Sequence, residues 1–138
     1  MPKPKYQQII WDWNGTLLND AWLCYEITSE QLKALDHPGL TFDEYRDTFG
    51  HTVYDFYRRI GVNISRSKFS ELAERFHSRY LERLSECSLH EGILDILSEF
   101  QKLGISQYIL SAHPEDLLLK TIEKHGISHF FSGISGQK

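Results

Sequence analysis

The pattern of apolar and polar positions predicts a first strand, then four consecutive helices, and then a stretch in which helices and strands alternate. An apolar run at 6–11 predicts a first strand. Helical spacing follows at about 20–35, 41–49, 53–60 and 67–84. The last of these segments has apolar residues at the three-or-four spacing of an amphipathic helix, namely Phe69, Leu72, Phe76, Tyr80 and Leu84. We expect the four segments to form a small helical bundle.

Capping and turn residues mark the ends of these helices. Asn19 or Asp20 can cap the first helix, which the Asp-His-Pro-Gly sequence at 36–39 ends. Thr41 followed by Glu44 has the spacing of a capping box. The second and third helices are closed by glycines, Gly50 and Gly61.

After the bundle, the pattern predicts an α/β arrangement again. The segment 91–103 is a predicted helix closed by Gly104, and 105–110 is a predicted strand that ends at Ser111. Pro114 suits the first position of a further helix to about Lys124, and 127–134 has the composition of a short third strand. We therefore expect an α/β core, 1–18 with 88–138, that carries residues 19–87 as a helical insertion.

Composition and charge describe an ordinary globular chain. The 138 residues are 41% hydrophobic and 25% charged, with a net charge of −4. Basic residues are scattered among acids, so we expect no nucleic-acid partner. No apolar stretch approaches the roughly 18 residues of a membrane span, and the N-terminus is too short and polar for a signal peptide, so we expect a cytoplasmic protein with no membrane partner. Cys24 and Cys87 are spaced too widely for a disulfide framework or a zinc site and are interpreted as reduced packing residues.

The segment after the first strand contains the main candidate chemistry. Asp12 follows the strand directly, and an Asn14-Gly15-Thr16 turn comes next. In open α/β sheets ligands bind outside the carboxyl ends of the strands, where Ser111 is also expected. Asp12 and Ser111 could therefore face one bound oxyanion. The alternative is that Asn-Gly simply makes a good turn.

The segment from Asp12 to Leu17 resembles motif I of the haloacid dehalogenase (HAD) superfamily, Asp-x-Asp-Gly-Thr-Leu, whose first Asp is the nucleophile in most phosphotransfer members. In this chain, Asn14 replaces the second Asp. The helical insertion resembles the C1 cap, Ser111 resembles motif II, and Lys138 falls about where the motif III lysine is expected. The resemblance implies an α/β fold, with a Rossmann-like core around an incomplete parallel sheet and an inserted α-helical bundle cap.

The resemblance also implies a Mg²⁺-dependent phosphatase of the phosphoglycolate phosphatase type, acting on a small phosphorylated metabolite. Asp12 would attack phosphorus and form an aspartyl-phosphate. The metal would be held by the Asp12 carboxylate and the Asn14 backbone carbonyl. The phosphoryl oxygens would be held by the Ser111 hydroxyl, the Lys138 ammonium and the N–H groups of Gly15, Thr16 and Ala112.

Asn14 and the end of the chain favour an alternative. An amide cannot exchange protons as the family's second Asp does, and such acid–base help is worth about 10²–10⁴-fold in rate. Motif IV, the acidic pair that completes the Mg²⁺ site, has no counterpart before Lys138. The chain could therefore be a catalytically impaired HAD-like fragment or a binding module without enzymatic activity. We expect little or no turnover from these 138 residues.

Four further residues are candidates for substrate contact. Gly50 and His51 resemble the cap loop that recognises substrate in related phosphatases, with Arg46 as a possible anion contact; the alternative is helix termination beside solvated charges. His113 could contact substrate or cap the next helix. The other histidines lack metal-ligand spacing, and the aromatic stripe of the insertion is interpreted as bundle core.

The small number of predicted strands suggests an exposed sheet edge. Strands flanking the first strand are missing from the pattern, so its backbone groups would lack partners. We expect either a fragment of a longer protein or a homo-oligomer that pairs through this edge.

Overall fold

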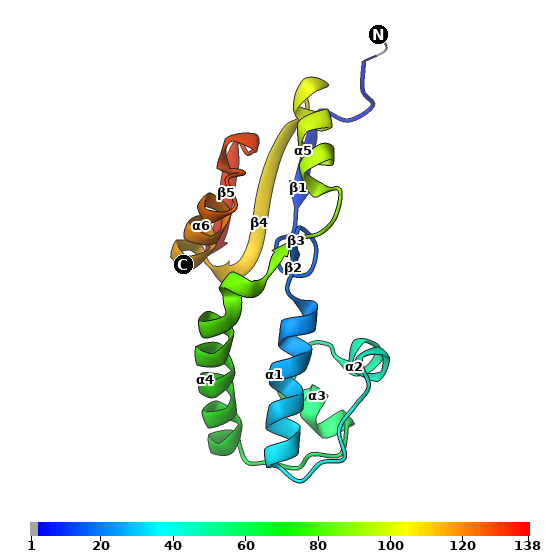
Figure 1. Ribbon diagram of the computed structural model, residues 1–138, viewed down its shortest axis with the longest axis vertical. Coiled ribbons are helices and arrows are strands. Elements are labelled where there is room, and N and C mark those ends of the chain that lie inside the picture. The colour runs from blue at the N-terminus through cyan, green and yellow to red at the C-terminus, as the bar shows by residue number, and fades with distance from the viewer. Residues whose placement is uncertain (1–2) are drawn as a thin grey trace. The chain divides into compact units, whose positions relative to one another are not determined.

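The computed structural model describes residues 3–138 and divides into two compact units (Figure 1). The α/β unit consists of the described residues up to Asp20 together with residues 87–138. The helical unit consists of residues 21–86. Among residues 3–138, no helix combines the length and the apolar character that a membrane crossing requires.

The α/β unit is built on a three-stranded parallel sheet in the order β1-β4-β5. The strands are β1 (Gln8–Trp11), β4 (Ser106–Pro114) and β5 (Gly133–Gln137). β1 pairs with β4 from Gln8 opposite Ser106 to Trp11 opposite Ile109. Because parallel strands end at the same edge of a sheet, Asp12, directly after β1, lies at the edge where β4 and β5 also end.

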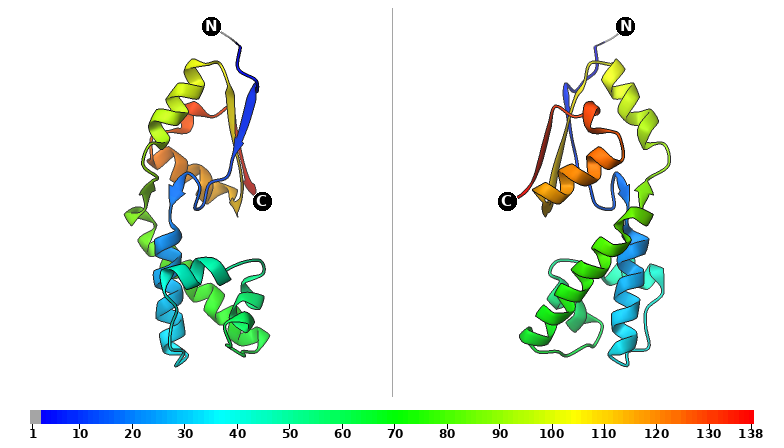
Figure 2. Two further views of the ribbon diagram at one scale, coloured as in Figure 1. Left: turned by 90° about the vertical axis from the view of Figure 1, so that its right-hand side faces the viewer. Right: turned by 60° about the vertical axis from the view of Figure 1, so that its left-hand side comes forward.

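Two helices cover one face of this sheet (Figure 2). They are α5 (Ile93–Lys102) and α6 (Glu115–Lys124). The fully buried side chains between helices and sheet include Leu97, Ile109, Leu118 and Ile122. The periodic apolar positions of these segments therefore form the core of the unit, as their spacing predicts.

One buried polar side chain, Gln107, joins strand and helix within this core. It is 1% exposed. Its Nε2 donates to the Leu97 carbonyl at 3.0 Å, and its Oε1 accepts from the Trp11 indole N–H at 3.0 Å. Both ends of the amide therefore have partners, as burial of a polar group requires.

A two-stranded antiparallel ribbon joins the points where the insertion leaves and rejoins the α/β unit. It pairs β2 (Leu18–Asn19) with β3 (Ser88–Leu89). The His90 N–H extends the pairing by donating to the Leu17 carbonyl at 3.0 Å. This ribbon is absent from the sequence prediction, because each strand is too short to show a period of two.

The helical unit contains four α-helices, as predicted. They are α1 (Ala21–Ala34), α2 (Phe42–Thr48), α3 (Val53–Arg59) and α4 (Arg66–Arg83). The predicted capping box is confirmed: the Thr41 hydroxyl accepts from the Glu44 N–H and the Glu44 carboxylate accepts from the Thr41 N–H, each at 3.1 Å. Hydrogen bonding of the Glu44 carboxylate to the Thr41 backbone N–H, and to the Thr41 side chain, lowers the pKa of the Glu44 carboxyl. A single turn of 3₁₀ helix, η1 (Leu84–Glu86), follows α4.

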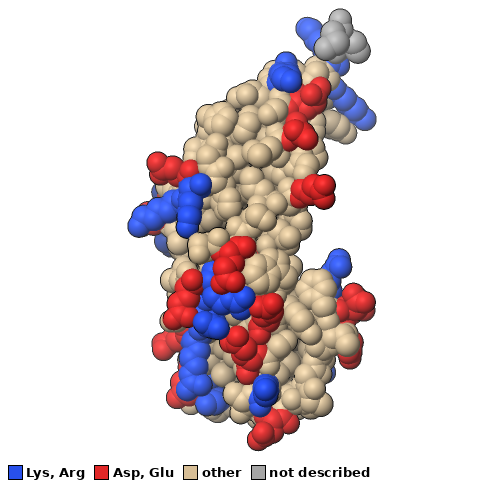
Figure 3. Space-filling model, viewed as in Figure 1, with Lys and Arg blue, Asp and Glu red and all other residues tan. Residues whose placement is uncertain are grey.

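The charged residues of the helical unit lie on its surface and pair with one another. Figure 3 shows Lys and Arg intermixed with Asp and Glu over α4. Arg83 of α4 contacts Glu26 of α1 at 2.7 Å, and Arg79 contacts Glu30 at 3.4 Å. The carboxylates that pair with Arg83 raise the pKa of its guanidinium. Ion pairs at a protein surface contribute little to stability.

The boundaries around β4 and β5 differ from the prediction. β4 continues past Ser111 to Pro114, which precedes α6 and is not its first residue. The pairing shifts between Leu110, opposite Ser135, and Pro114, opposite Gln137. The segment 127–134 does not form one strand, because a 3₁₀ turn, η2 (Ser128–Phe130), precedes β5.

Gly136 explains why this irregular pairing is possible. A Cβ at this position would lie 2.6 Å from the Glu115 Cα and 2.7 Å from the His113 carbonyl oxygen. The Gly136 N–H donates to the Glu115 carboxylate at 3.2 Å. The end of β5 therefore packs directly against the backbone after Ser111, where a larger residue would clash.

Candidate active site

Asp12 presents an exposed carboxylate directly after β1. Its Oδ1 accepts from the Trp13 N–H at 2.9 Å, and its Oδ2 accepts from the Thr16 hydroxyl at 3.2 Å. The carboxylate is therefore held in one orientation while remaining accessible, as a nucleophile requires.

The turn after Asp12 is wound around the carbonyl of Trp13. This carbonyl accepts from the N–H groups of Thr16, Leu17 and Leu18 at 3.1–3.2 Å. The Gly15 N–H donates to the Leu18 carbonyl at 3.0 Å, and Gly15 has a φ of +74°, which favours glycine. The Trp13 side chain, 1% exposed, fixes the turn to the core.

This winding concerns two groups of the predicted phosphate site. The Gly15 and Thr16 N–H groups both donate to carbonyls inside the turn. Their role toward a phosphoryl oxygen stays a prediction. The Thr16 hydroxyl, unlike its N–H, donates to the Asp12 carboxylate.

A chain of hydrogen bonds links the turn to β4 and to the start of the insertion. The His113 N–H donates to the Ser111 Oγ at 3.1 Å, and the Ser111 hydroxyl donates to the Asn14 Oδ1 over a long 3.5 Å. The Asn14 Nδ2 donates to the Asp20 Oδ2 at 3.0 Å. The structure thus brings together Asn14 and Ser111, two predicted site residues that are 97 positions apart.

Asp20 is a residue of this cluster that the sequence analysis considered only as a helix cap. Its side chain is 2% exposed and bonded to the Asn14 amide. A carboxylate six residues after Asn14, in a segment flanked by leucines and tryptophan, is the signal that could have identified it. A buried carboxylate needs hydrogen-bond donors, and Asn14 provides one.

The remaining predicted residues of the α/β unit lie near the same edge of the sheet. Ala112 is exposed in the irregular part of β4, and His113 beside it is partly buried. Lys138 is exposed and directly follows the carboxyl end of β5. Parallel pairing puts the end of β5 at the edge where Asp12 lies, but the roles of these residues in binding stay predictions.

The predicted substrate contacts of the insertion belong to the helical unit. Arg46 lies over the Phe42 ring, 5.7 Å from its centre. Gly50 lies beside the Arg59 guanidinium, which donates to the Thr48 carbonyl at 3.2 Å, and His51 is exposed. Each of these residues contacts or neighbours residues of its own unit, and their roles toward a substrate also stay predictions.

The sequence pattern of haloacid dehalogenase-like hydrolases matches residues 9–138, nearly the whole chain. The chain belongs to the haloacid dehalogenase-like hydrolase family. The predicted family and the α/β fold are thereby confirmed.

Similar proteins include two curated members of this family named phosphoglycolate phosphatase. The one from Vibrio parahaemolyticus is 23% identical over 146 residues, covering 99% of this chain and 63% of the relative. The one from Rhodobacter capsulatus is 23% identical over 132 residues, covering 93% of this chain and 60% of the relative. The chain therefore spans a little over three fifths of the length of these relatives.

Solved structures show the same fold at low sequence identity. A haloacid dehalogenase-like family hydrolase from Streptococcus pneumoniae superimposes with a TM-score of 0.76 at 23% identity, over 96% of this chain and 62% of that one. This similarity indicates that the arrangement of strands around Asp12 is the arrangement of the haloacid dehalogenase-like fold.

The donor atoms at the turn fit a magnesium ion of the kind expected for haloacid dehalogenase-like phosphatases. Among residues 3–138, no three His, Cys, Asp or Glu side chains are arranged to hold a metal. Mg²⁺, however, commonly binds through one or two carboxylates and completes its shell with waters and substrate phosphate oxygens. The exposed Asp12 carboxylate suits that mode, with the Asn14 backbone carbonyl as the second expected ligand.

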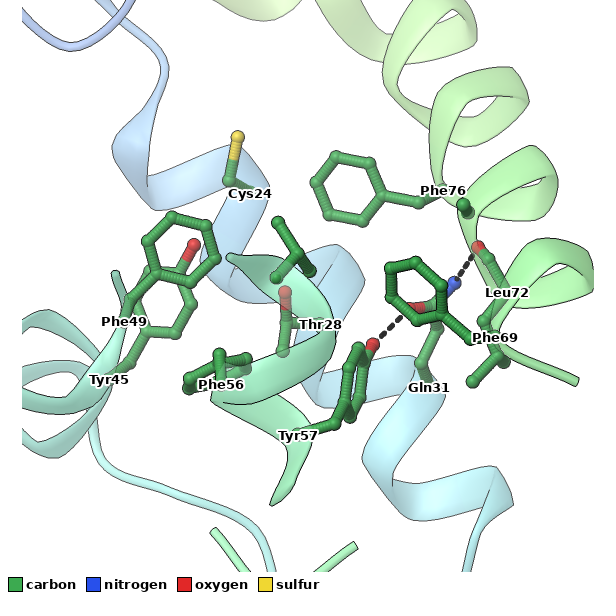
Figure 4. A pocket seen from close by; sticks show the side chains of 12 residues that line it. Cys24, Thr28, Gln31, Tyr45, Phe49, Phe56, Tyr57, Phe69, Leu72 and Phe76 are labelled. Carbon is green, nitrogen blue, oxygen red and sulfur yellow. Dashed lines mark hydrogen bonds between the residues drawn. The ribbon is translucent and has the colours of Figure 1, made fainter. Parts of the chain in front are cut away.

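The helical unit contains a different kind of site, an apolar cavity of about 270 Å³ (Figure 4). It is lined by Cys24, Thr28, Gln31, Tyr45, Phe49, Val53, Phe56, Tyr57, Phe69, Leu72, Ala73 and Phe76. Its polar groups bond to one another: the Tyr57 hydroxyl donates to the Gln31 Oε1 at 2.7 Å, and the Gln31 Nε2 donates to the Leu72 carbonyl at 2.8 Å. Burial raises the pKa of Tyr57 to about 12. With no charged side chain among its lining residues, this cavity does not suit a phosphate group.

Proposed function

We propose that this haloacid dehalogenase-like protein is a Mg²⁺-dependent phosphatase that acts on a small phosphorylated metabolite through an aspartyl-phosphate on Asp12. The observation that supports this most directly is the exposed Asp12 carboxylate, oriented by the Trp13 N–H and the Thr16 hydroxyl. Relatives named phosphoglycolate phosphatase favour a small phosphomonoester as the substrate.

The reaction divides into two displacements at phosphorus. In the first, an Asp12 oxygen forms a bond to phosphorus while the bond to the leaving oxygen breaks. In the second, water attacks phosphorus and releases the Asp12 carboxylate and phosphate. The Ser111 hydroxyl, the Ala112 N–H and the Lys138 ammonium would hold the phosphoryl oxygens during both steps. A Mg²⁺ ion bound by Asp12 and the Asn14 carbonyl would neutralise negative charge between carboxylate and phosphate.

Hydrolysis of 4-nitrophenyl phosphate tests this proposal. We expect slow turnover that depends on added Mg²⁺ and falls to background in Asp12→Asn. The matched control is Asp95→Asn, which removes an exposed carboxyl on α5 and should keep the wild-type rate. Turnover that survives in Asp12→Asn would contradict the nucleophile assignment.

Asn14 favours a second candidate function, a module that binds phosphorylated compounds without hydrolysing them. The amide stands where the family has its acid–base carboxylate, and its nitrogen is already bonded to Asp20. Titration calorimetry with inorganic phosphate and Mg²⁺ distinguishes the two functions when combined with the assay. Binding without any Asp12-dependent turnover would support the module, and Asp12-dependent turnover would exclude it.

A further inference from the structure

The Asn14 amide has one orientation that its neighbours allow. The Asn14 Nδ2 donates to the Asp20 Oδ2 at 3.0 Å, so the nitrogen end of the amide is directed toward Asp20. The amide oxygen then faces the Ser111 hydroxyl, as observed. Asp20 is 2% exposed, and shielding from water strengthens this bond. Asp20 is therefore a positioning residue that fixes which atom Asn14 presents to the site.

This arrangement leaves the turn without a side chain that can deliver a proton to a leaving oxygen. Asn14 can donate hydrogen bonds through its amide, but an amide does not transfer a proton near neutral pH. Asp20 is buried and its Oδ2 faces Asn14. The Thr16 and Ser111 hydroxyls donate to Asp12 and Asn14, and hydroxyl groups are poor acids.

We propose that the site acts on phosphorylated compounds whose leaving group departs as a stable anion, namely acyl and aryl phosphates, in preference to alkyl phosphomonoesters. This inference rests on the proposed function. In the first step, the Asp12 oxygen bonds to phosphorus, and the electron pair of the broken P–O bond stays on the leaving oxygen as a carboxylate or phenolate. No proton is needed for that departure, whereas an alkoxide would need one.

The second step, hydrolysis of the aspartyl-phosphate, also lacks a side chain in the turn that could accept a proton from water. Water forms a bond to phosphorus, the P–O bond to Asp12 breaks, one proton of the water remains on the released phosphate and the other passes to solvent. Without a base at position 14, we expect this hydrolysis to be slow. The aspartyl-phosphate should therefore accumulate, and 4-nitrophenolate should appear first as a burst that approaches one equivalent per protein chain.

A series of leaving groups tests the inference in the full chain with Mg²⁺. The substrates are acetyl phosphate, 4-nitrophenyl phosphate, phenyl phosphate and propyl phosphate, compared by kcat/KM. We expect a steep fall along this series in the wild type. Equal rates for the aryl and alkyl esters would overturn the inference while leaving the proposed function in place.

A double substitution, Asn14→Asp with Asp20→Asn, gives the matched comparison. It exchanges carboxyl and amide across the same 3.0 Å contact, so it avoids two carboxylates side by side. We expect kcat/KM for propyl phosphate to rise by about 10²–10⁴-fold while kcat/KM for 4-nitrophenyl phosphate, which reports the first step alone, changes little. If the double variant unfolds by circular dichroism, the wild-type series still decides the question.

Two single variants separate the remaining explanations. Asp20→Asn alone keeps an amide at position 14. Its kcat/KM should therefore fall along the series of leaving groups as steeply as in the wild type. A flattened series in Asp20→Asn would overturn the inference. In His113→Gln, kcat/KM should likewise fall along the series as steeply as in the wild type. A selective loss of propyl phosphate hydrolysis in this variant would identify His113 as the acid and overturn the inference. Absence of both turnover and Asp12 phosphorylation with acetyl phosphate would overturn the proposed function, and this inference with it.

Discussion

The two units of this chain differ in where they place buried polar groups. In the α/β unit, Asp20, Ser111 and Gln107 are buried, and Ser111 and Gln107 bond to the side chains of Asn14 and Trp11, 97 and 96 positions away. In the helical unit, the core is mainly aromatic and aliphatic, as in the perpendicular contact of Tyr45 with Phe56 at 5.9 Å. Its salt bridges lie on the surface of α1 and α4.

The polar side chains of the two units therefore have different surroundings. Polar side chains at the ends of strands are held by a rigid sheet, where they can meet a ligand in a fixed geometry. The buried Gln31 and Tyr57 of the helical unit instead bond to each other and to the backbone of α4. The polar groups of the candidate site therefore lie in the α/β unit, whereas the bonds of Gln31 and Tyr57 stay inside the helical unit.

The largest effect on stability is expected from the aromatic core of the helical unit. Phe56 is 1% exposed and contacts Tyr45, Phe49 and Tyr57. Phe56→Ala removes these contacts and should lower the free energy of unfolding by about 3–5 kcal/mol in urea denaturation. Val53→Ala, on the same helix at a residue 43% exposed, is the control and should cost less than about 1 kcal/mol. Similar losses in both variants would show that the core is not close-packed.

A smaller loss is expected from the polar core of the α/β unit. Gln107→Met keeps the length of the side chain but leaves the Trp11 indole N–H and the Leu97 carbonyl without their partner. We expect a cost of about 2 kcal/mol, because unpaired buried polar groups retain their desolvation penalty. Gln101→Met, at an exposed position on α5, should be nearly neutral in the same denaturation experiment. A neutral Gln107→Met would mean that this unit too is held by apolar contacts alone.

The features that could be predicted from the sequence are those that depend on nearby residues. The four helices of the bundle follow from apolar spacing and from caps such as Thr41 with Glu44. The ribbon of β2 with β3 could not be predicted, because it pairs Leu18 with Leu89 across the whole insertion. The shifted pairing after Leu110 depends on Gly136, whose closest neighbours are His113 and Glu115.

In the candidate site too, the sequence predicts what depends on neighbouring residues and not what depends on how the turn folds. Asp12 could be placed at the sheet edge because a strand pattern ends directly before it. The closure of the turn on the Trp13 carbonyl, in which the Thr16 N–H takes part, is not visible in the sequence pattern. Asp20 was missed as a site residue because its burial against Asn14 depends on the turn folding back on itself.

The smallest expected effect is a change in the free energy of unfolding at high pH. It comes from Tyr57, which is buried in the helical unit. Burial raises the pKa of this phenol from its ordinary value of 10.0 to about 12. Above pH 10, the unfolded chain loses the proton while the folded chain keeps it, so folding stability falls as pH rises toward 12. Tyr57→Phe removes both the titrating group and the bond to the Gln31 Oε1.

Comparing the wild type with Tyr57→Phe at several pH values isolates this contribution, because the other tyrosines titrate in both proteins. At pH 8 the wild type should be more stable by about 1 kcal/mol, the usual net worth of one hydrogen bond. The difference should shrink steadily between pH 10 and 11 in urea denaturation. The reason is that deprotonation of Tyr57 stabilises the unfolded state of the wild type, whereas Tyr57→Phe has no proton to lose there. A difference that stays constant over this range would indicate that water reaches the Tyr57 hydroxyl. The core of the helical unit would then be more accessible to solvent than its aromatic contacts imply.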